Sequence, residues 1–301
     1  MEEVIKRRKR FKKVKPATVI TYVVLSMYLL LLFVPFLVIL FTSFMSDAEI
    51  VDNGFHLFPK KFSIEGYELI FGVGTDFEDV PNLFLGFFNT LWQTLIPLVG
   101  GLFVSALVAF IYSKFKFPGR KALFMITVLT MTFPLGAFGF VSFLFYQNIG
   151  WVGGARGILP IIIPGLFGSA TVIFFLRTYF DSALSNDVLE SAKIDGAGTF
   201  RIFFTMVLPL AKPAVIAQFL LGFVGGYNSY GAALMYLYKS ESLWNLQLTL
   251  SEMVSFVSQE GGGYNNAQCA VAIMGLLPLL VLYIFVQKYF IEGINIGGGK
   301  E

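Results

Sequence analysis

Six long stretches without a charged residue divide this 301-residue chain, and nothing else in it restricts the fold as strongly. Each has at least 20 residues, and they cover 16–46, 80–113, 122–155, 157–176, 213–238 and 261–287. A helix needs about 20 apolar residues to cross roughly 30 Å of hydrocarbon. None of the stretches alternates with the period of 2 typical of a barrel strand. The sequence therefore predicts an all-α integral membrane protein with six helices, near 18–44, 85–112, 123–147, 157–178, 210–237 and 268–288.

The basic residues predict the orientation of these helices, because Lys and Arg concentrate in cytoplasmic loops. With the N-terminus inside, 18 of the 22 Lys and Arg lie on the inner side and 4 on the outer side. The longest outer loop, 46–83, carries eight acidic residues instead. We therefore expect both termini in the cytoplasm and a multi-pass protein of the cytoplasmic (inner) membrane of a prokaryote.

The N-terminus combines a basic start with an apolar run, as a signal peptide does. The run 16–46 is too long for a signal peptide and no Ala-x-Ala site follows it, so we interpret it as an anchor. The basic cluster in residues 6–15 favours an orientation signal, and binding of anionic lipid heads is the alternative.

Several classes of function lack the residues that they need. One cysteine, Cys269, and one histidine, His56, exclude a disulfide framework, a Cys/His zinc site and a histidine-based triad. No P-loop motif is present. No predicted helix centre carries an ionisable residue, which argues against a proton-driven carrier. Sodium held by backbone carbonyls stays open. An energy source outside the chain is therefore the more attractive hypothesis.

The inner segment 181–213 is the most informative part of the sequence. Asp187 and Glu190 resemble a capping box ahead of a short helix at about 188–195, which Gly196 and Gly198 would end. Small residues follow one another where a second protein could approach closely, and Glu190 and Asp195 are available to pair with basic residues. An ordinary connecting loop with helix caps is the alternative.

This segment resembles the cytoplasmic loop of permeases from importers of the ATP-binding-cassette (ABC) class, with the pattern E-A-A-x3-G-x9-I-x-L-P. Five of the seven positions match: Glu190, Ala192, Gly196, Leu208 and Pro209. Ser191 replaces the first alanine, and Met206 replaces the isoleucine. The resemblance implies the type I importer fold (ABC transmembrane type-1). It also implies that the loop docks into an ATPase subunit through a coupling surface of Glu190, Ser191, Ala192, Asp195, Gly196 and Ala197.

Other stretches resemble the second permease of carbohydrate importers such as the maltose system. The inner turn 114–121, the outer run 58–63, the Tyr227-Asn228 pair and the ending 287–293 carry this resemblance. It implies a basic tail at 1–16, a first helix and outer loop at 17–83, a core at 84–288 and a tail at 289–301. In the maltose-type relative that tail reaches between the ATPase subunits, but Gly297-Gly298-Gly299 departs from its pattern.

The resemblance also implies the partners. They are a homologous second permease, two copies of an ABC ATPase and an extracytoplasmic sugar-binding protein, with membrane lipid around the spans and no nucleic acid. The chain itself would hold no cofactor, since ATP and Mg²⁺ would bind to the partner ATPase.

Neutral sugars are bound by amides and hydroxyls beside aromatic faces. The fifth predicted helix offers such groups in Gln218, Tyr227, Asn228, Ser229 and Tyr230. The second adds Asn89, Thr90, Gln93 and Thr94, and Asn89 and Gln93 share a helical face. Such groups also hold helices together, which the sequence favours for Gln218 and Gln93, whereas Asn228 suits both roles equally.

We therefore predict a permease subunit, not an enzyme, that imports a sugar or oligosaccharide by alternating access and is coupled to a separate ATPase through residues 185–200. A secondary carrier or channel for a small neutral solute is the alternative. An integral membrane enzyme is the least favoured class, because Glu190 and Asp195 are poor substitutes for paired catalytic acids.

Overall fold

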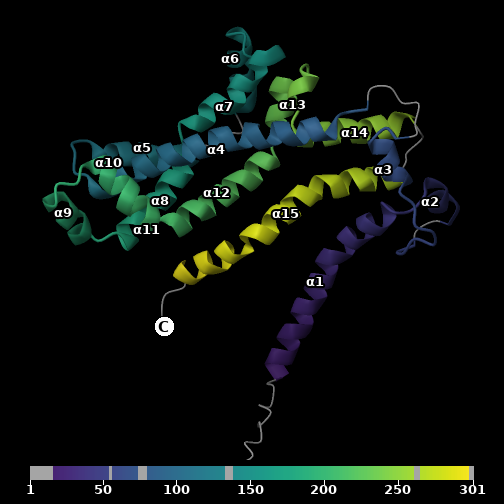
Figure 1. The fold of residues 1–301 in the computed structure, drawn as a ribbon, viewed down its shortest axis with the longest axis horizontal. Helices are drawn as coiled ribbons and strands as arrows, with labels where there is room; N and C mark the ends of the chain where they lie inside the picture. Colours follow the sequence, from purple (N-terminus) through teal and green to yellow (C-terminus); the bar gives the residue numbers. More distant parts are fainter. Residues whose placement is uncertain (1–15, 54–55, 74–79, 133–137, 261–264, 298–301) are drawn as a thin grey trace, which may run out of the picture. The chain divides into compact units, whose positions relative to one another are not determined.

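The computed structural model describes residues 16–53, 56–73, 80–132, 138–260 and 265–297. Every element in these ranges is a helix, which confirms the all-α prediction for the described part of the chain (Figure 1). The chain divides into two compact units, Met1–Asp76 with Gly261–Ile273 and Phe77–Glu260 with Met274–Glu301. The expected basic tail lies almost wholly outside the described residues.

The first unit contains α1 (Pro16–Thr42), α2 (Asp47–Asn53), α3 (Glu65–Ile70) and the first residues of α15 (Asn265–Gly297). The backbone of α3 lies directly against α15, because a Cβ at Gly66 would stand 2.9 Å from the carbonyl of Asn266. The buried Asn266 amide in turn donates to the Met45 carbonyl at 3.2 Å. These contacts join the loop that follows α1 to the start of α15.

Glu49 organises the loop between α2 and α3 in this unit. Its carboxylate accepts from the Lys60 backbone N–H at 2.6 Å and contacts His56 Nε2 at 2.8 Å. The hydrogen bond from Lys60, together with the one to His56, lowers the pKa of Glu49 below its usual value. The carboxylate therefore holds the chain that returns from α2 toward α3.

The second unit is built around the long helix α4 (Leu83–Lys114). Helices α7 (Leu159–Leu166), α8 (Ala170–Ala183), α12 (Lys212–Tyr227) and α14 (Leu246–Glu260) pack along it (Figure 1). The remaining elements are α5 (Arg120–Thr132), α6 (Gly139–Asn148), η2 (Gly154–Ile158), α9 (Asn186–Ile194), α10 (Thr199–Ile202), η3 (Phe203–Val207), α11 (Leu208–Leu210), α13 (Gly231–Leu237) and η4 (Glu241–Leu243).

Glycine allows the closest approaches to α4, as small residues do between membrane helices. A Cβ at Gly101 would collide with the Gly165 carbonyl oxygen of α7, and one at Gly226 of α12 would stand 2.5 Å from the Thr94 methyl. Gly222, one turn before Gly226, faces Leu98 in the same way. Gly225 and Gly231 have no neighbour within 4 Å, so they contribute nothing to this packing.

Within the described residues, four helical segments are long and apolar enough to cross a membrane: Pro16–Thr42, Leu83–Lys114, Gly154–Ala183 and Asn265–Ile284. A fifth arises if Thr199–Leu210 and Lys212–Tyr227, bent by 77°, form one span. Pro209 and Pro213 flank this bend, and neither can donate a backbone hydrogen bond. The multi-pass prediction is thus confirmed, whereas the number six is not.

Three predicted helices differ from the structure. The helix expected at 157–178 is interrupted at 167–169, between α7 and α8. The helix expected at 123–147 corresponds to α5 and α6, and residues 133–137 between them lie outside the described part. The helix expected at 210–237 ends at Tyr227, and a turn at 228–230 separates it from α13. The prediction misses this turn because it rests on the absence of charged residues, and Asn228, Ser229 and Tyr230 are all uncharged.

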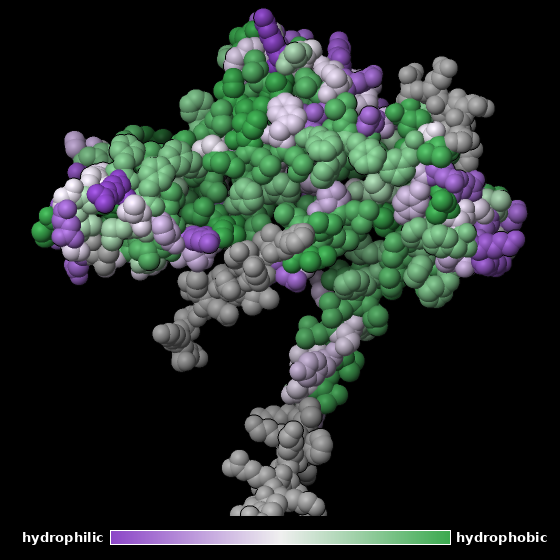
Figure 2. All heavy atoms as spheres, in the orientation of Figure 1, coloured by the Kyte–Doolittle hydropathy of each residue, from purple (hydrophilic) through white to green (hydrophobic). Residues whose placement is uncertain are grey.

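Hydrophobic side chains cover much of the outer surface. Leu123, Met125, Ile126 and Leu129 of α5 are all about half exposed or more. Figure 2 shows hydrophobic residues along the packed helices of the second unit and hydrophilic ones gathered near α9. This distribution fits a chain whose solvent is lipid between polar ends.

Candidate functional site

The α9 helix turns one polar face outward. Asp187, Glu190, Ser191 and Ile194 recur at the spacing of one helical face, and all four are exposed. The opposite face buries Leu189 and Ala192. Hence α9 packs on the protein through an apolar stripe, and its opposite face is exposed.

The buried stripe packs into a cluster of aromatic side chains. Leu189 and Ala192 belong to the same buried cluster as Phe110 of α4, Phe180 of α8 and Phe203 of η3, which are at most 3% exposed. The segment is therefore an integral part of the second unit.

A glycine cap ends α9. Gly196 has φ of +80° and its N–H bonds to the Lys193 carbonyl, while the Ala197 N–H bonds to the Ala192 carbonyl, each at 3.0 Å. This pair of bonds is the Schellman motif, which needs a left-handed residue and so favours glycine. Gly198 has φ of −67° and does not share this requirement.

The structure corrects the predicted boundaries of this helix. It spans 186–194, so Asp187 lies within its first turn and does not precede it as a cap. A carboxylate there still favours the positive end of the helix. The predicted stop at Gly196 is confirmed, and the difference arises because several neighbouring residues of this segment can cap a helix.

The six predicted coupling residues differ in how far they are buried. Glu190, Ser191, Asp195 and Gly196 are exposed, Ala197 is half-buried, and Ala192 is buried. The sequence interpretation missed Ile194, which is 86% exposed at the centre of the outward face. Ile194 lies four residues after Glu190, so helical spacing could have placed it on the same face from the sequence alone.

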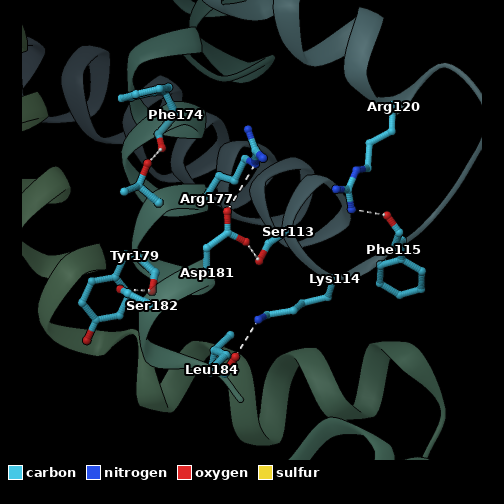
Figure 3. Close-up of polar contacts among 11 residues, drawn as sticks. Ser113, Lys114, Phe115, Arg120, Phe174, Arg177, Tyr179, Asp181, Ser182 and Leu184 are labelled. Atoms are coloured by element: carbon cyan, nitrogen blue, oxygen red, sulfur yellow. Dashed lines mark hydrogen bonds and ion pairs between the residues drawn. The ribbon is translucent and has the colours of Figure 1, made fainter. Parts of the chain in front are cut away.

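Polar contacts tie the base of this segment to the end of α4 (Figure 3). Ser113 donates to Asp181 of α8 at 2.6 Å, and Lys114 Nζ donates to the Leu184 carbonyl at 2.5 Å. Arg177 lies 3.6 Å from Asp181 and 3.6 Å above the ring of Phe124 in α5. Three helices therefore meet at the point where the chain leaves α8 for α9.

A cleft of about 380 Å³ lies beside α9. Four of its lining residues are cationic: Lys114, Lys116, Arg120 and Lys193. Glu190 is the one acidic residue in the lining. Arg120 also donates to the Phe115 carbonyl at 2.9 Å, which holds the turn between α4 and α5 in place. The side of α9 that borders this cleft is therefore rich in cations, whereas acids occur at Asp187 and Glu190 on its outward face and at Asp195 just after its end.

A second cleft, also of about 380 Å³, lies farther along α4 and is called the α4–α12 cleft here. It is lined by residues of α4, α7, α8 and α12 together with Ser229 and Asn245, and no lining residue is charged. Apolar side chains such as Pro97, Leu98 and Leu102 form much of its wall.

Two of the five predicted pathway residues, Gln218 and Ser229, line this cleft. Tyr227 is 1% exposed and donates to the Gly275 carbonyl at 2.8 Å, so it holds α12 to α15. Asn228 donates to the Val224 carbonyl of its own helix, and Tyr230 accepts from Ser251 at 3.4 Å. Neither lines the cleft.

Comparison with known proteins agrees with this arrangement. Residues 101–295 match the family described as binding-protein-dependent transport system inner membrane component. The arabinooligosaccharides transport system permease protein AraQ of Bacillus subtilis is 30% identical, over 97% of this chain and 98% of its own length. The diacetylchitobiose uptake system permease protein NgcG of Streptomyces coelicolor is 28% identical, over 92% and 87%.

The fold is also that of a solved transporter. A chain of a bacterial ABC transporter involved in the import of the acidic polysaccharide alginate superposes with a TM-score of 0.80. It is 24% identical, and the match covers 93% of this chain and 99% of that one. The sequence, the apolar helices and the fold therefore agree: the chain belongs to the family of inner-membrane permease components of binding-protein-dependent transport systems.

Proposed function

We propose that this chain is one of two permeases in an ATP-driven importer of a sugar or oligosaccharide. A homologous second permease, two ATPase copies and an extracytoplasmic binding protein complete the assembly. Six spans with both termini in the cytoplasm agree with the positions of the basic residues. The chain performs no catalysis, and ATP and Mg²⁺ bind to the ATPase.

The outward face of α9 carries this proposal. A side chain as apolar as Ile194 at 86% exposure, beside Glu190 and Asp195, has the composition of a docking surface rather than of a lipid-facing one. Closure of the ATPase dimer moves α9, and its buried stripe and the contacts of Lys114 and Ser113 pass the movement to α4. The spans then open alternately to the two sides.

Reversal of the charge at Glu190 tests this coupling. In proteoliposomes that contain the whole complex, we expect Glu190→Lys to lower ATP-driven uptake at least tenfold, since a lost interface charge pair costs about 2–5 kcal/mol. ATP hydrolysis should continue, and the protein should insert normally.

Glu241→Lys is the matched control, because it makes the same change at an exposed acid in η4. Normal uptake by Glu190→Lys would remove the docking role of α9. Uptake that responds to ionophores and is indifferent to ATP would instead favour a secondary carrier.

A further inference from the structure

The α4–α12 cleft contains a buried polar atom that has no partner. Gln93 is 5% exposed and lines the cleft, and its Oε1 makes no hydrogen bond to any described residue. A buried acceptor left unsatisfied costs about 1–3 kcal/mol, so such an atom in a native structure needs an explanation.

The orientation of the Gln93 amide is fixed by its other end. Its Nε2 donates to the Leu243 carbonyl at 2.7 Å. Rotation of the amide by 180° would bring two carbonyl oxygens to that distance, so the nitrogen must face Leu243 and the oxygen must stay unpaired.

The neighbouring polar groups already have partners. Thr90 donates to the Gly86 carbonyl and accepts from the Leu246 N–H, while Asn245 donates to the Ser229 carbonyl and accepts from the Leu248 N–H. None of these groups can therefore turn away to satisfy Gln93.

Gln218 is a further amide in the cleft, besides the hydroxyls of Thr94, Ser105, Ser169 and Ser229. It comes from α12, lines the same cleft, is half-buried and makes no hydrogen bond to a described residue. The cleft thus offers one fixed acceptor, one adjustable amide and an apolar wall, with no charge among its lining residues.

We propose that the α4–α12 cleft is a subsite for one neutral sugar unit on its way through the permease. Gln93 Oε1 has almost no accessible surface in this conformation, so the adjoining wall of the cleft yields when a sugar hydroxyl enters and donates to it. The Gln218 amide bonds a further hydroxyl, and the C–H face of the ring packs on Pro97 and Leu98. A volume of about 380 Å³ lies within the range of small-molecule sites. This subsite rests on the proposed sugar transport.

The absence of charge in the lining selects among sugars. A uronate or phosphate in this cleft would lose its hydration without gaining a cation, which is costly. The subsite therefore suits neutral oligosaccharides and disfavours acidic ones.

Cysteine protection in the assembled complex tests the subsite. Cys269→Ser provides a background without cysteine, in which Ser229→Cys places a thiol in the cleft and Gly225→Cys places one on an exposed face outside it. The thiols react with a methanethiosulfonate reagent without and with arabinotriose, galactobiose, diacetylchitobiose or digalacturonate. We expect at least one neutral sugar to slow labelling at residue 229 fivefold or more, with no effect at residue 225 and none from digalacturonate.

Two further variants separate the effect of the acceptor Gln93 Oε1 from the effect of the loop that Gln93 Nε2 holds at Leu243. Gln93→Met removes both the acceptor and the bond to Leu243 and should abolish protection. Asn89→Leu also releases this loop, because Asn89 donates to the Ser242 and Trp244 carbonyls at 2.9 Å, but it does not line the cleft. It should leave protection intact. Gln218→Leu breaks no hydrogen bond and should weaken protection about threefold.

Three results would overturn the subsite while leaving the transport function in place. They are uptake of a neutral sugar that gives no protection, equal protection in Gln93→Met, and protection by digalacturonate. A complex that takes up none of the four sugars with ATP would instead overturn the proposed function, and the subsite with it.

Discussion

Single residues of this chain have roles that neighbours of the same type do not share. Gly196 and Gly198 stand two positions apart, yet Gly196 alone adopts a left-handed backbone. A spacing pattern shows where glycines occur, whereas the hydrogen bonds of the Schellman motif show which one the helix needs.

Gly196→Ala should therefore destabilise the end of α9, and Gly198→Ala should not. A left-handed conformation costs an alanine about 1–2 kcal/mol, and no atom within 4 Å would obstruct a Cβ at either position. We expect amide exchange at Gly196 and Ala197 to become about tenfold faster or more in the first variant. Equal exchange in both variants would mean that the cap does not hold α9.

At the scale of elements, the apolar pattern predicts the existence of helices better than their ends. The predicted start and end of the first helix and of α4 agree with the structure within two residues or so. The turn at 228–230 and the 77° bend before α12 were not predicted, because proline and glycine occur both at breaks and inside helices here. Pro97 and Pro278, for example, lie within α4 and α15.

The same scale explains which site residues were predictable. The outward face of α9 follows from a local motif, so Glu190 and Ser191, two of its four residues, were found from the sequence. The α4–α12 cleft joins residues more than a hundred positions apart, and the unpaired atom of Gln93 depends on a bond to Leu243. No local pattern predicts a contact between residues so far apart in the sequence. The sequence favoured a packing role for Gln93, and that role explains the hydrogen bond of its nitrogen but not its unpaired oxygen.

The packing of α12 on α4 gives a prediction for two adjacent glycines. Gly226→Ala should lower the apparent melting temperature of the detergent-solubilised chain by a few degrees, since overpacking costs about 1–3 kcal/mol. Its Cβ would press on the buried Thr94. Gly225→Ala makes the same change where no atom lies within 4 Å and should leave the temperature equal or higher. A lower temperature for Gly225→Ala alone would mean that another face of α12 carries the packing.

At the scale of the whole molecule, one helix connects the two candidate sites. Ser113 and Lys114 bind the base of the α9 segment, and Gln93 lies on the same helix about 30 Å away at 1.5 Å per residue. Movement of α9 can reach the cleft through α4 without any loop between them. The partners that produce this movement lie outside the chain.

Purification of the assembly tests that last step. A tagged chain, extracted from its native membrane in mild detergent, should recover a second permease and an ATPase with a Walker motif, identified by mass spectrometry. The Glu190→Lys chain should recover the permease but several-fold less ATPase, because the substitution changes α9 and leaves the spans intact. A homo-oligomer without ATPase would contradict the importer and place a carrier first. Equal ATPase recovery with both chains, together with equal uptake, would keep the importer and move its coupling surface away from Glu190.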